Sequence, residues 1–133
     1  MSVKKFNLQL KKEIAATDEL VEDKIISIGL DAFRRIVLKA PVDTGRFRGN
    51  WIVSKNTFNN TTNQITDKSG GQTIIKGNKV IETFEYKKDK SIIIQNNLSY
   101  ANVLENGSSK QSPQGIVAPT IVEIQRAYRN VLI

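Results

Sequence analysis

The feature that most constrains this fold is a cluster of turn residues at 40–46, with the sequence Ala-Pro-Val-Asp-Thr-Gly-Arg. It separates a long helical pattern from a strand pattern that begins at Trp51. Pro41 has no backbone N–H and disfavours helical angles at the residue before it, so a helix arriving from upstream should end here. Gly45 can adopt a positive φ without steric cost. The cluster therefore predicts a rigid corner between a helix and a strand.

Polar side chains of this corner should hold its shape. Asp43 and Thr44 can accept hydrogen bonds from backbone groups a few residues ahead of them. We expect Arg46 and Arg48 to lie close to Asp43, which makes Asp43 more plausible as a partner in a structural ion pair than as a catalytic acid. The predicted structural corner consists of Pro41, Asp43, Thr44, Gly45, Arg46 and Trp51.

Apolar residues upstream of the corner recur at steps of three, four or seven, as one face of a helix requires. They are Leu10, Ile14, Val21, Ile25, Ile28, Ala32 and Ile36. Thr17 or Asp18 can cap a helix start, and acidic residues follow in the first turn. We predict a helix over about 17–39, with an earlier helix at 8–16 as an option. Residues 1–10 alternate polar and apolar, which favours an extended arm or an added edge strand.

The same helix has a second apolar stripe, formed by Ile26, Gly29, Leu30, Phe33 and Val37. The two stripes together are wider than one sheet face needs. Two alternatives stay open: the helix is well buried in its own domain, or it also packs against a neighbouring subunit. On the second alternative Ile26, Leu30 and Phe33 are subunit-contact candidates.

After the corner, β-forming residues predict a strand from Trp51. Residues 56–73 are polar and rich in Asn and Thr, and predict a mobile loop. Segments 73–75 and 80–86 flank Gly77-Asn78 and predict two strands joined by a turn, with a short helix at 78–86 as the competing interpretation. Residues 87–90 predict a charged turn, and the isoleucines within 91–95 predict a buried strand.

The C-terminal part predicts a short helix over 100–107, ended by Gly107, and a flexible connector over 108–115. Pro119 then opens a helix over 120–132. Its buried face should consist of Ile121, Ile124, Tyr128 and Val131. The whole predicts one α+β domain over residues 1–133: a long N-terminal helix, a small antiparallel sheet, a short helix and a C-terminal helix.

Composition argues against most enzyme chemistry. The chain has neither Cys nor His, which excludes thiol nucleophiles, the commonest general base and most zinc sites. No spacing forces together any two of the acidic candidates Asp43, Glu82, Glu85, Glu105 and Glu123. We therefore predict a non-catalytic domain with no cofactor and no metal, and keep as one alternative an enzyme that uses only carboxylates, Lys or Tyr.

The net charge of +7 suggests nucleic acid as a partner. The basic excess is spread along the chain and is not gathered in one block, so a mildly basic solvated surface explains it as well. A non-sequence-specific nucleic-acid-binding module therefore stays as the second function. No run of about 18 apolar residues and no leader is present, which predicts no membrane contact and a cytoplasm-like compartment.

Two motifs carry a resemblance to a known family. The corner at 40–46, closing a long amphipathic helix and followed by a strand led by Trp51, resembles the signature of the tail-completion or neck proteins of long-tailed double-stranded DNA bacteriophages. Residues 96–101 (Asn-Asn-Leu-Ser-Tyr-Ala) and 104–117 are similar to that family's block after its last strand. The family often has an aromatic residue where Asn106 stands and proline where Ser99 stands.

The resemblance implies a structural virion protein of the phage neck, assembled in the host cytoplasm. It implies a homo-oligomeric, hexameric ring that completes the tail and joins it to the DNA-filled head. Its partners would be a head-completion or connector protein and a tail terminator protein, with non-specific contact to genome DNA in the lumen. Contacts are then expected from the helix and from the 98–117 segment, where the candidates are Tyr100, Leu104, Glu105, Lys110 and Gln111.

Overall fold

The long helix α1 (Asp18–Lys39) forms as its apolar spacing predicts. Acidic Asp18 and Glu19 lie in its first turn and Lys39 lies in its last, where each complements the helix macrodipole. The computed structural model describes residues 4–7 and 18–129, so the optional helix at 8–16 lies outside the described residues. The residues that α1 buries are Val21, Ile28, Gly29, Ala32, Phe33, Ile36 and Val37.

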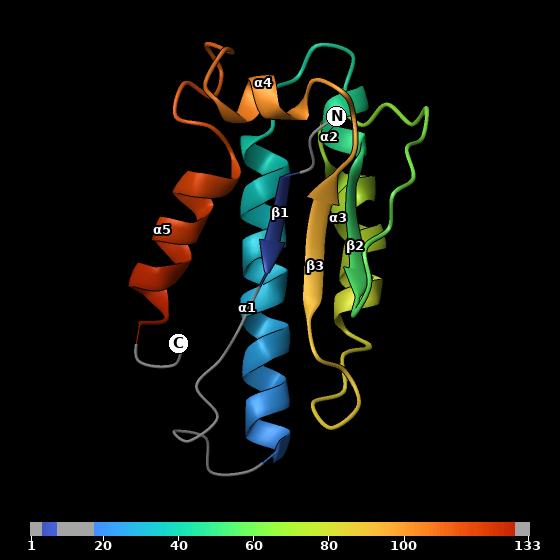
Figure 1. The fold of residues 1–133 in the computed structure, drawn as a ribbon, viewed down its shortest axis with the longest axis vertical. Helices are drawn as coiled ribbons and strands as arrows, with labels where there is room; N and C mark the ends of the chain where they lie inside the picture. The colour runs from blue at the N-terminus through green and yellow to red at the C-terminus, as the bar shows by residue number, and fades with distance from the viewer. Residues whose placement is uncertain (1–3, 8–17, 130–133) are drawn as a thin grey trace.

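The sheet has three antiparallel strands in the order β1-β3-β2 (Figure 1). Strand β1 (Lys4–Asn7) is an edge strand, as the N-terminal alternation suggests, and β2 (Trp51–Lys55) is the other edge. Every residue of the central strand β3 (Ile92–Asn96) is buried, which confirms the buried strand predicted there. Fold class is therefore α+β, as predicted.

A helix stands where the sequence favoured two strands. Helix α3 (Gly71–Ile81) lies where two strands were predicted at 73–75 and 80–86, so those strands are wrong. The competing interpretation of a helix in this region is confirmed, but its predicted bounds of 78–86 are wrong. Its buried residues Thr73, Gly77 and Ile81 are spaced four apart, so they form one face that packs on α1 and β2. Gly77 is therefore a helix-packing residue and not a turn residue.

The second stripe of α1 is covered by α3. A Cβ on Gly29 would lie 3.1 Å from a methyl group of Ile81, and a Cβ on Gly77 would overlap the ring of Phe33. Phe33 is fully buried, which corrects its assignment as a subunit contact, while Ile26 and Leu30 are partly buried against the core. The contacts with α3 support the alternative in which α1 is buried in its own domain.

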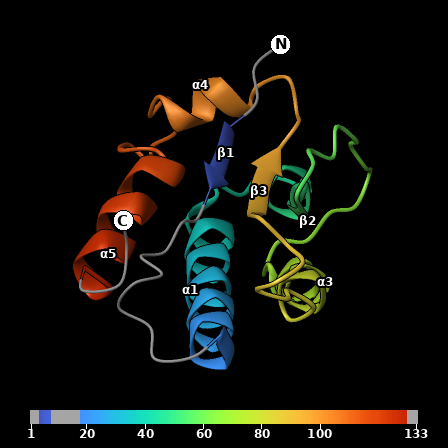
Figure 2. The same cartoon turned by 60° about the horizontal axis from the view of Figure 1, so that its bottom comes forward.

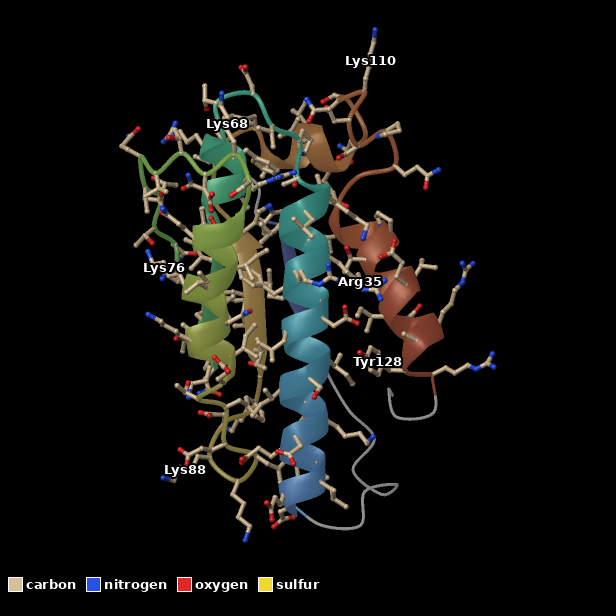
Figure 3. All side chains as sticks on the ribbon, turned by 180° about the vertical axis from the view of Figure 1, so that it is seen from behind. Arg35, Lys68, Lys76, Lys88, Lys110 and Tyr128 are labelled. Atoms are coloured by element: carbon tan, nitrogen blue, oxygen red, sulfur yellow. The ribbon has the colours of Figure 1, made fainter. Side chains whose placement is uncertain are left out.

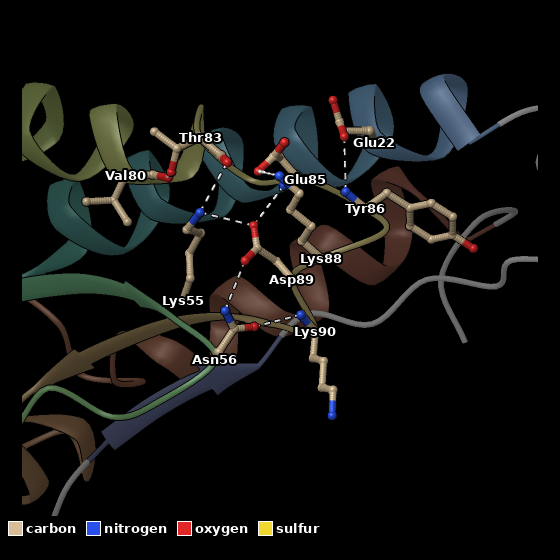
Figure 4. Close-up of polar contacts among 10 residues, drawn as sticks. All are labelled: Glu22, Lys55, Asn56, Val80, Thr83, Glu85, Tyr86, Lys88, Asp89 and Lys90. Carbon is tan, nitrogen blue, oxygen red and sulfur yellow. Dashed lines mark hydrogen bonds and ion pairs between the residues drawn. The ribbon is translucent and has the colours of Figure 1, made fainter.

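A charged loop joins α3 to β3 (Figure 4). The Asp89 carboxylate accepts hydrogen bonds from Lys55 Nζ and from Asn56 Nδ2, both at 3.0 Å. Earlier in the same loop, Tyr86 N–H donates to the Glu22 carboxylate of α1 at 3.0 Å. The turn predicted at 87–90 is confirmed, and it is held by the end of β2 as well as by α1.

Two helices complete the C-terminal part. The short helix α4 (Ala101–Glu105) is followed by Gly107 at φ 87°, as predicted. Helix α5 (Val117–Ala127) begins before the predicted start at 120 and ends earlier than 132. Its buried face is Val117, Thr120 and Ile124; Ile121 is 37% exposed, so its predicted burial is wrong, and Val131 lies outside the described residues.

The three longest helices form a layer behind the sheet, while α4 lies beyond one end of it (Figure 1). Figure 2 shows α1 and α3 side by side under the strands, with α5 on the other side of α1 from α3. None of the helices in the described part of the chain is long and apolar enough to cross a membrane.

Candidate functional site

The two segments that carry the family resemblance contact each other directly. The side-chain amide of Gln111 donates to the Val42 carbonyl at 3.0 Å, and its oxygen accepts from the Val42 N–H at 2.8 Å. Nearby, Ser112 Oγ donates to the Lys39 carbonyl. We call this contact between residues 39–42 and Gln111-Ser112 the clasp. It fixes the connector at 108–115 on the corner.

Arg48 provides hydrogen-bond donors to the free carbonyl groups at the C-terminal end of α1. Its guanidinium donates to the carbonyls of Leu38 at 3.1 Å, Ala40 at 2.7 Å and Lys68 at 2.8 Å. The last carbonyls of a helix lack partners within the helix and carry partial negative charge, so a cation there is doubly favourable. Burial lowers the pKa of Arg48, and the charge of Asp67 opposes this.

The backbone of the corner follows the sequence prediction. Gly45 has φ 92°, and Thr44 Oγ1 accepts from the Arg46 N–H at 3.2 Å. Pro41 is buried just beyond the last turn of α1. The corner does not lead straight into the strand, however, because a single helical turn, α2 (Arg46–Gly49), comes between them.

The predicted ion pairing of Asp43 is wrong. Asp43 is exposed and pairs with no cation among the described residues. Arg48 turns to the end of α1, as described above, and Arg46 Nε donates to the Asn63 carbonyl at 3.2 Å. Both arginines stabilise the corner by donating to main-chain carbonyls. Every residue has such a carbonyl, so the sequence does not show which one an arginine will bind.

Trp51 is the apolar anchor that the sequence predicts. Its side chain is buried, and its ring meets that of Phe47 edge to face at a centroid distance of 5.8 Å. The ring of Tyr100 also lies near Phe47, at a centroid distance of 5.9 Å, and Tyr100 is exposed. The corner and the start of α4 therefore share one aromatic cluster.

Glu105 serves a structural role in the described structure. Its carboxylate accepts from the N–H groups of Ile116 at 3.2 Å, Val117 at 2.9 Å and Ala118 at 3.0 Å. It thus caps the N-terminus of α5, where negative charge is favourable. Among the other contact candidates, Leu104 is partly buried against the core, whereas Lys110 is exposed and extends from the tip of the connector (Figure 3).

Sequence reasoning missed a network of buried amides that holds the polar loop. Asn50 accepts from the Asn63 N–H at 2.9 Å, and Gln95 accepts from the Asn59 N–H at 2.9 Å. Asn97 donates to the carbonyls of Asn59 and Thr61. The loop predicted over 56–73 therefore lies on the sheet at several points, and its last three residues belong to α3. The sequence does contain one signal for this network, because three side-chain amides in a row, at 95–97, follow the isoleucines of a buried strand.

Asp67 was also missed, and it caps α3. Its carboxylate accepts from Gly70 N–H at 3.1 Å and from both the N–H and the hydroxyl of Thr73, at 2.8 and 2.7 Å. Burial would raise the pKa of Asp67, but the hydrogen bonds from Thr73 and Gly70 outweigh it and hold the pKa below its usual value. The N-cap residue itself is Gly70, so Asp67 caps α3 from three residues upstream and is not the usual N-cap signal.

Polar residues also join α5 to α1. Glu123 accepts from Lys39 Nζ at 2.6 Å and from Arg35 at 3.0 Å, and Asp31 accepts from Arg35 and from the Tyr128 hydroxyl, both at 2.9 Å. Figure 3 shows Arg35 and Tyr128 between the two helices. Hydrogen bonding from Lys39 lowers the pKa of Glu123, while burial opposes this.

The acidic candidates do not converge into a catalytic pair. Asp43 lies in the corner, Glu82 and Glu85 lie in the loop after α3, Glu105 caps α5 and Glu123 belongs to the ion-paired cluster. Across residues 18–129, no three acidic side chains gather in a group that could hold a metal ion.

Comparison with protein-family models finds no match for this chain. Comparisons with curated proteins and with solved structures find none either.

Proposed function

We propose that this protein is a structural, non-catalytic component of the neck of a long-tailed double-stranded DNA bacteriophage. In this role copies of the chain form a ring, a hexamer by family resemblance, that completes the tail and joins it to the filled head. The observation that supports the proposal most is the clasp. Gln111 lies in one motif of the resemblance and Val42 in the other, and their direct contact makes the two motifs one unit.

The roles of the charged residues support an assembly protein over an enzyme. Glu105 and Asp67 each cap a helix, and Glu123 bridges α5 to Lys39 and Arg35 of α1. These carboxylates are occupied in holding elements together. A general acid or base instead needs hydrogen-bond reach to a substrate.

A ring of head-to-tail subunits needs two different complementary patches on each chain. Large apolar side chains are exposed on two opposite sides of α1. Ile75 of α3 is 59% exposed, and Val122 of α5 is 44% exposed with Ile121 beside it in sequence. We propose that these two sides meet in the ring, while Tyr100, Leu104 and Lys110 at the end of the molecule face a neighbouring ring, either the head-completion or connector protein or the tail terminator.

The deciding experiment examines the particles that form when the phage lacks this protein. We expect filled heads and separate tails that do not join, with joining restored when the wild-type chain is supplied. Electron microscopy of intact virions should then place the protein at the top of the tail, and light scattering should report the oligomeric state of the free protein. Normal joined virions without the protein would contradict the proposal.

One observation favours nucleic acid as a second candidate function. Lys68, Lys76 and Lys79 are exposed, and none pairs with a carboxylate among the described residues. Such lysines contact phosphate without reading sequence. Binding to a DNA duplex should then fall steeply as salt rises. No measurable binding at low salt would remove this candidate.

A further inference from the structure

A groove of about 460 Å³ runs beside the edge strand β2. It is lined by residues 51–53 of β2, by the polar loop from Asn59 to Ile65, and by α3 from Gln72 to Val80. Several lining residues also have structural roles, such as Asn63 in the amide network and Thr73 in the Asp67 cap, but those roles do not account for the open space between them. Its position beside an edge strand raises the question of what it holds.

The backbone of β2 is paired on one side only. Strand β2 ends the sheet order, and its backbone pairs with β3 along the register from Trp51 opposite Asn96 to Lys55 opposite Ile92. Residues 51–54 make no further backbone–backbone hydrogen bond with other described residues. An edge of this kind is a template for another extended chain, and several peptide-binding domains use it in that way.

The lining of the groove specifies the chemistry of an occupant. Ile52, Ile65 and Val80 provide apolar surface, and Lys76 is the one charged residue among the lining residues. Figure 3 shows Lys76 on the side of α3 that faces away from α1. A cation with no carboxylate beside it in the groove complements an anionic group on the occupant.

We propose that the β2 edge and its groove bind an extended peptide segment that alternates apolar side chains and carries a carboxylate. The peptide backbone pairs with β2, its apolar side chains contact Ile52, Ile65 and Val80, and its carboxylate pairs with Lys76. Residues 51–53 span about 10 Å of strand, which corresponds to three residues of the peptide. This inference does not depend on the proposed neck function.

The single Trp of the chain, Trp51, lines the groove and provides the measurement. The probe is an acetylated and amidated hexapeptide in which valine alternates with threonine and glutamate; the control peptide has lysine in place of glutamate. We expect a saturable change in Trp51 emission with the acidic peptide and binding at least about tenfold weaker with the basic one. Amide exchange at residues 51–54 should slow when the acidic peptide binds.

Two variants separate the groove from general surface charge. Lys76→Glu should reverse the preference between the two peptides. Lys79→Glu changes the net charge equally on the same helix but lies outside the groove lining, so it should keep the wild-type preference. Both side chains are exposed, so neither change should affect folding.

Three outcomes would overturn the proposal. One is the absence of any saturable emission change with the acidic peptide at millimolar concentration. Another is an equal loss of binding in Lys76→Glu and Lys79→Glu, which would indicate diffuse charge attraction. A third is Trp51 emission that depends on protein concentration alone and does not respond to the peptide, which would indicate a second copy of the chain in the groove.

Discussion

The ring of Phe33 occupies the space that a Cβ on residue 77 would need. Gly77 is therefore fixed by packing between α1 and α3, and not by any need for a special backbone angle. The contact explains why a glycine sits in the middle of a helix, where it is unfavourable by about 1 kcal/mol relative to alanine.

Gly77→Ala should lower the free energy of unfolding by about 1–3 kcal/mol, because overpacking against Phe33 exceeds the gain in helix propensity. Denaturant unfolding measures this. Gly71→Ala, at the start of the same helix with only Ser69 Oγ at 3.4 Å, should be neutral or slightly stabilising. In a Phe33→Leu background the effect of Gly77→Ala should shrink, since neighbours in contact couple. Equal effects in both backgrounds would contradict this packing.

The clasp gives a second prediction. Gln111→Ala removes both hydrogen bonds to Val42, and each is worth about 0.5–1.5 kcal/mol net. Because Gln111 is exposed, we expect the lower end of that range in total, with a matching fall in melting temperature. Gln114→Ala, an exposed glutamine in the same connector, is the control and should leave stability unchanged. A melting temperature of Gln111→Ala equal to that of Gln114→Ala would mean that the two Gln111–Val42 bonds of the clasp add nothing to stability.

Glu105 gives a third prediction. Glu105→Ala should destabilise the protein by about 1–2 kcal/mol, because three N–H groups at the start of α5 lose their acceptor. Glu105→Gln keeps an acceptor oxygen and loses the charge, so its effect should be smaller. Thermal unfolding followed by circular dichroism measures both. Glu82→Ala, which removes an exposed carboxylate, should change stability by less than about 0.5 kcal/mol.

Asp67 gives a prediction on pH. Its pKa in the folded protein is lowered from the usual 3.8, so its contribution to stability is complete above that value and is lost as pH falls through the lower folded value. The free energy of unfolding should therefore decrease as the pH is lowered below about 4. Asp67→Asn should be less stable at pH 7 and show a shallower drop on acidification. A slope unchanged from wild type would exclude this role for Asp67.

Part of the acid-induced loss should remain in Asp67→Asn. Burial would raise the pKa values of Asp31 and Asp89, but hydrogen bonds from Arg35 and Tyr128 to Asp31, and from Asn56 and Lys55 to Asp89, lower both. Glu123 also has a lowered pKa, chiefly through its hydrogen bond with Lys39. These carboxylates follow the same linkage sign as Asp67 and keep part of the slope.

Local patterns in the sequence determined α1, β3, Gly45 at positive φ and the termination of α4 near Gly107. Helical spacing, a run of isoleucines and the angles that glycine permits act over a few residues, so they can be read without the fold. The candidate corner was predicted for the same reason. The positive φ of Gly45 and the burial of Trp51 followed from turn chemistry and residue size, whereas the helical turn α2 between them did not.

Only the tertiary structure decided what lies between these elements. Residues 71–81 form a helix because Asp67 caps their start and because α1 offers Phe33 to Gly77, neither of which short-range periodicity reveals. Tertiary packing also explains why Arg48 donates to main-chain carbonyls and does not pair with Asp43. It likewise places Gln111 beside Val42, which is 69 residues away in the sequence. A polar side chain forms a hydrogen bond with a donor or acceptor that tertiary packing places within about 3 Å of it. The sequence shows that side chain's chemistry but not its neighbours.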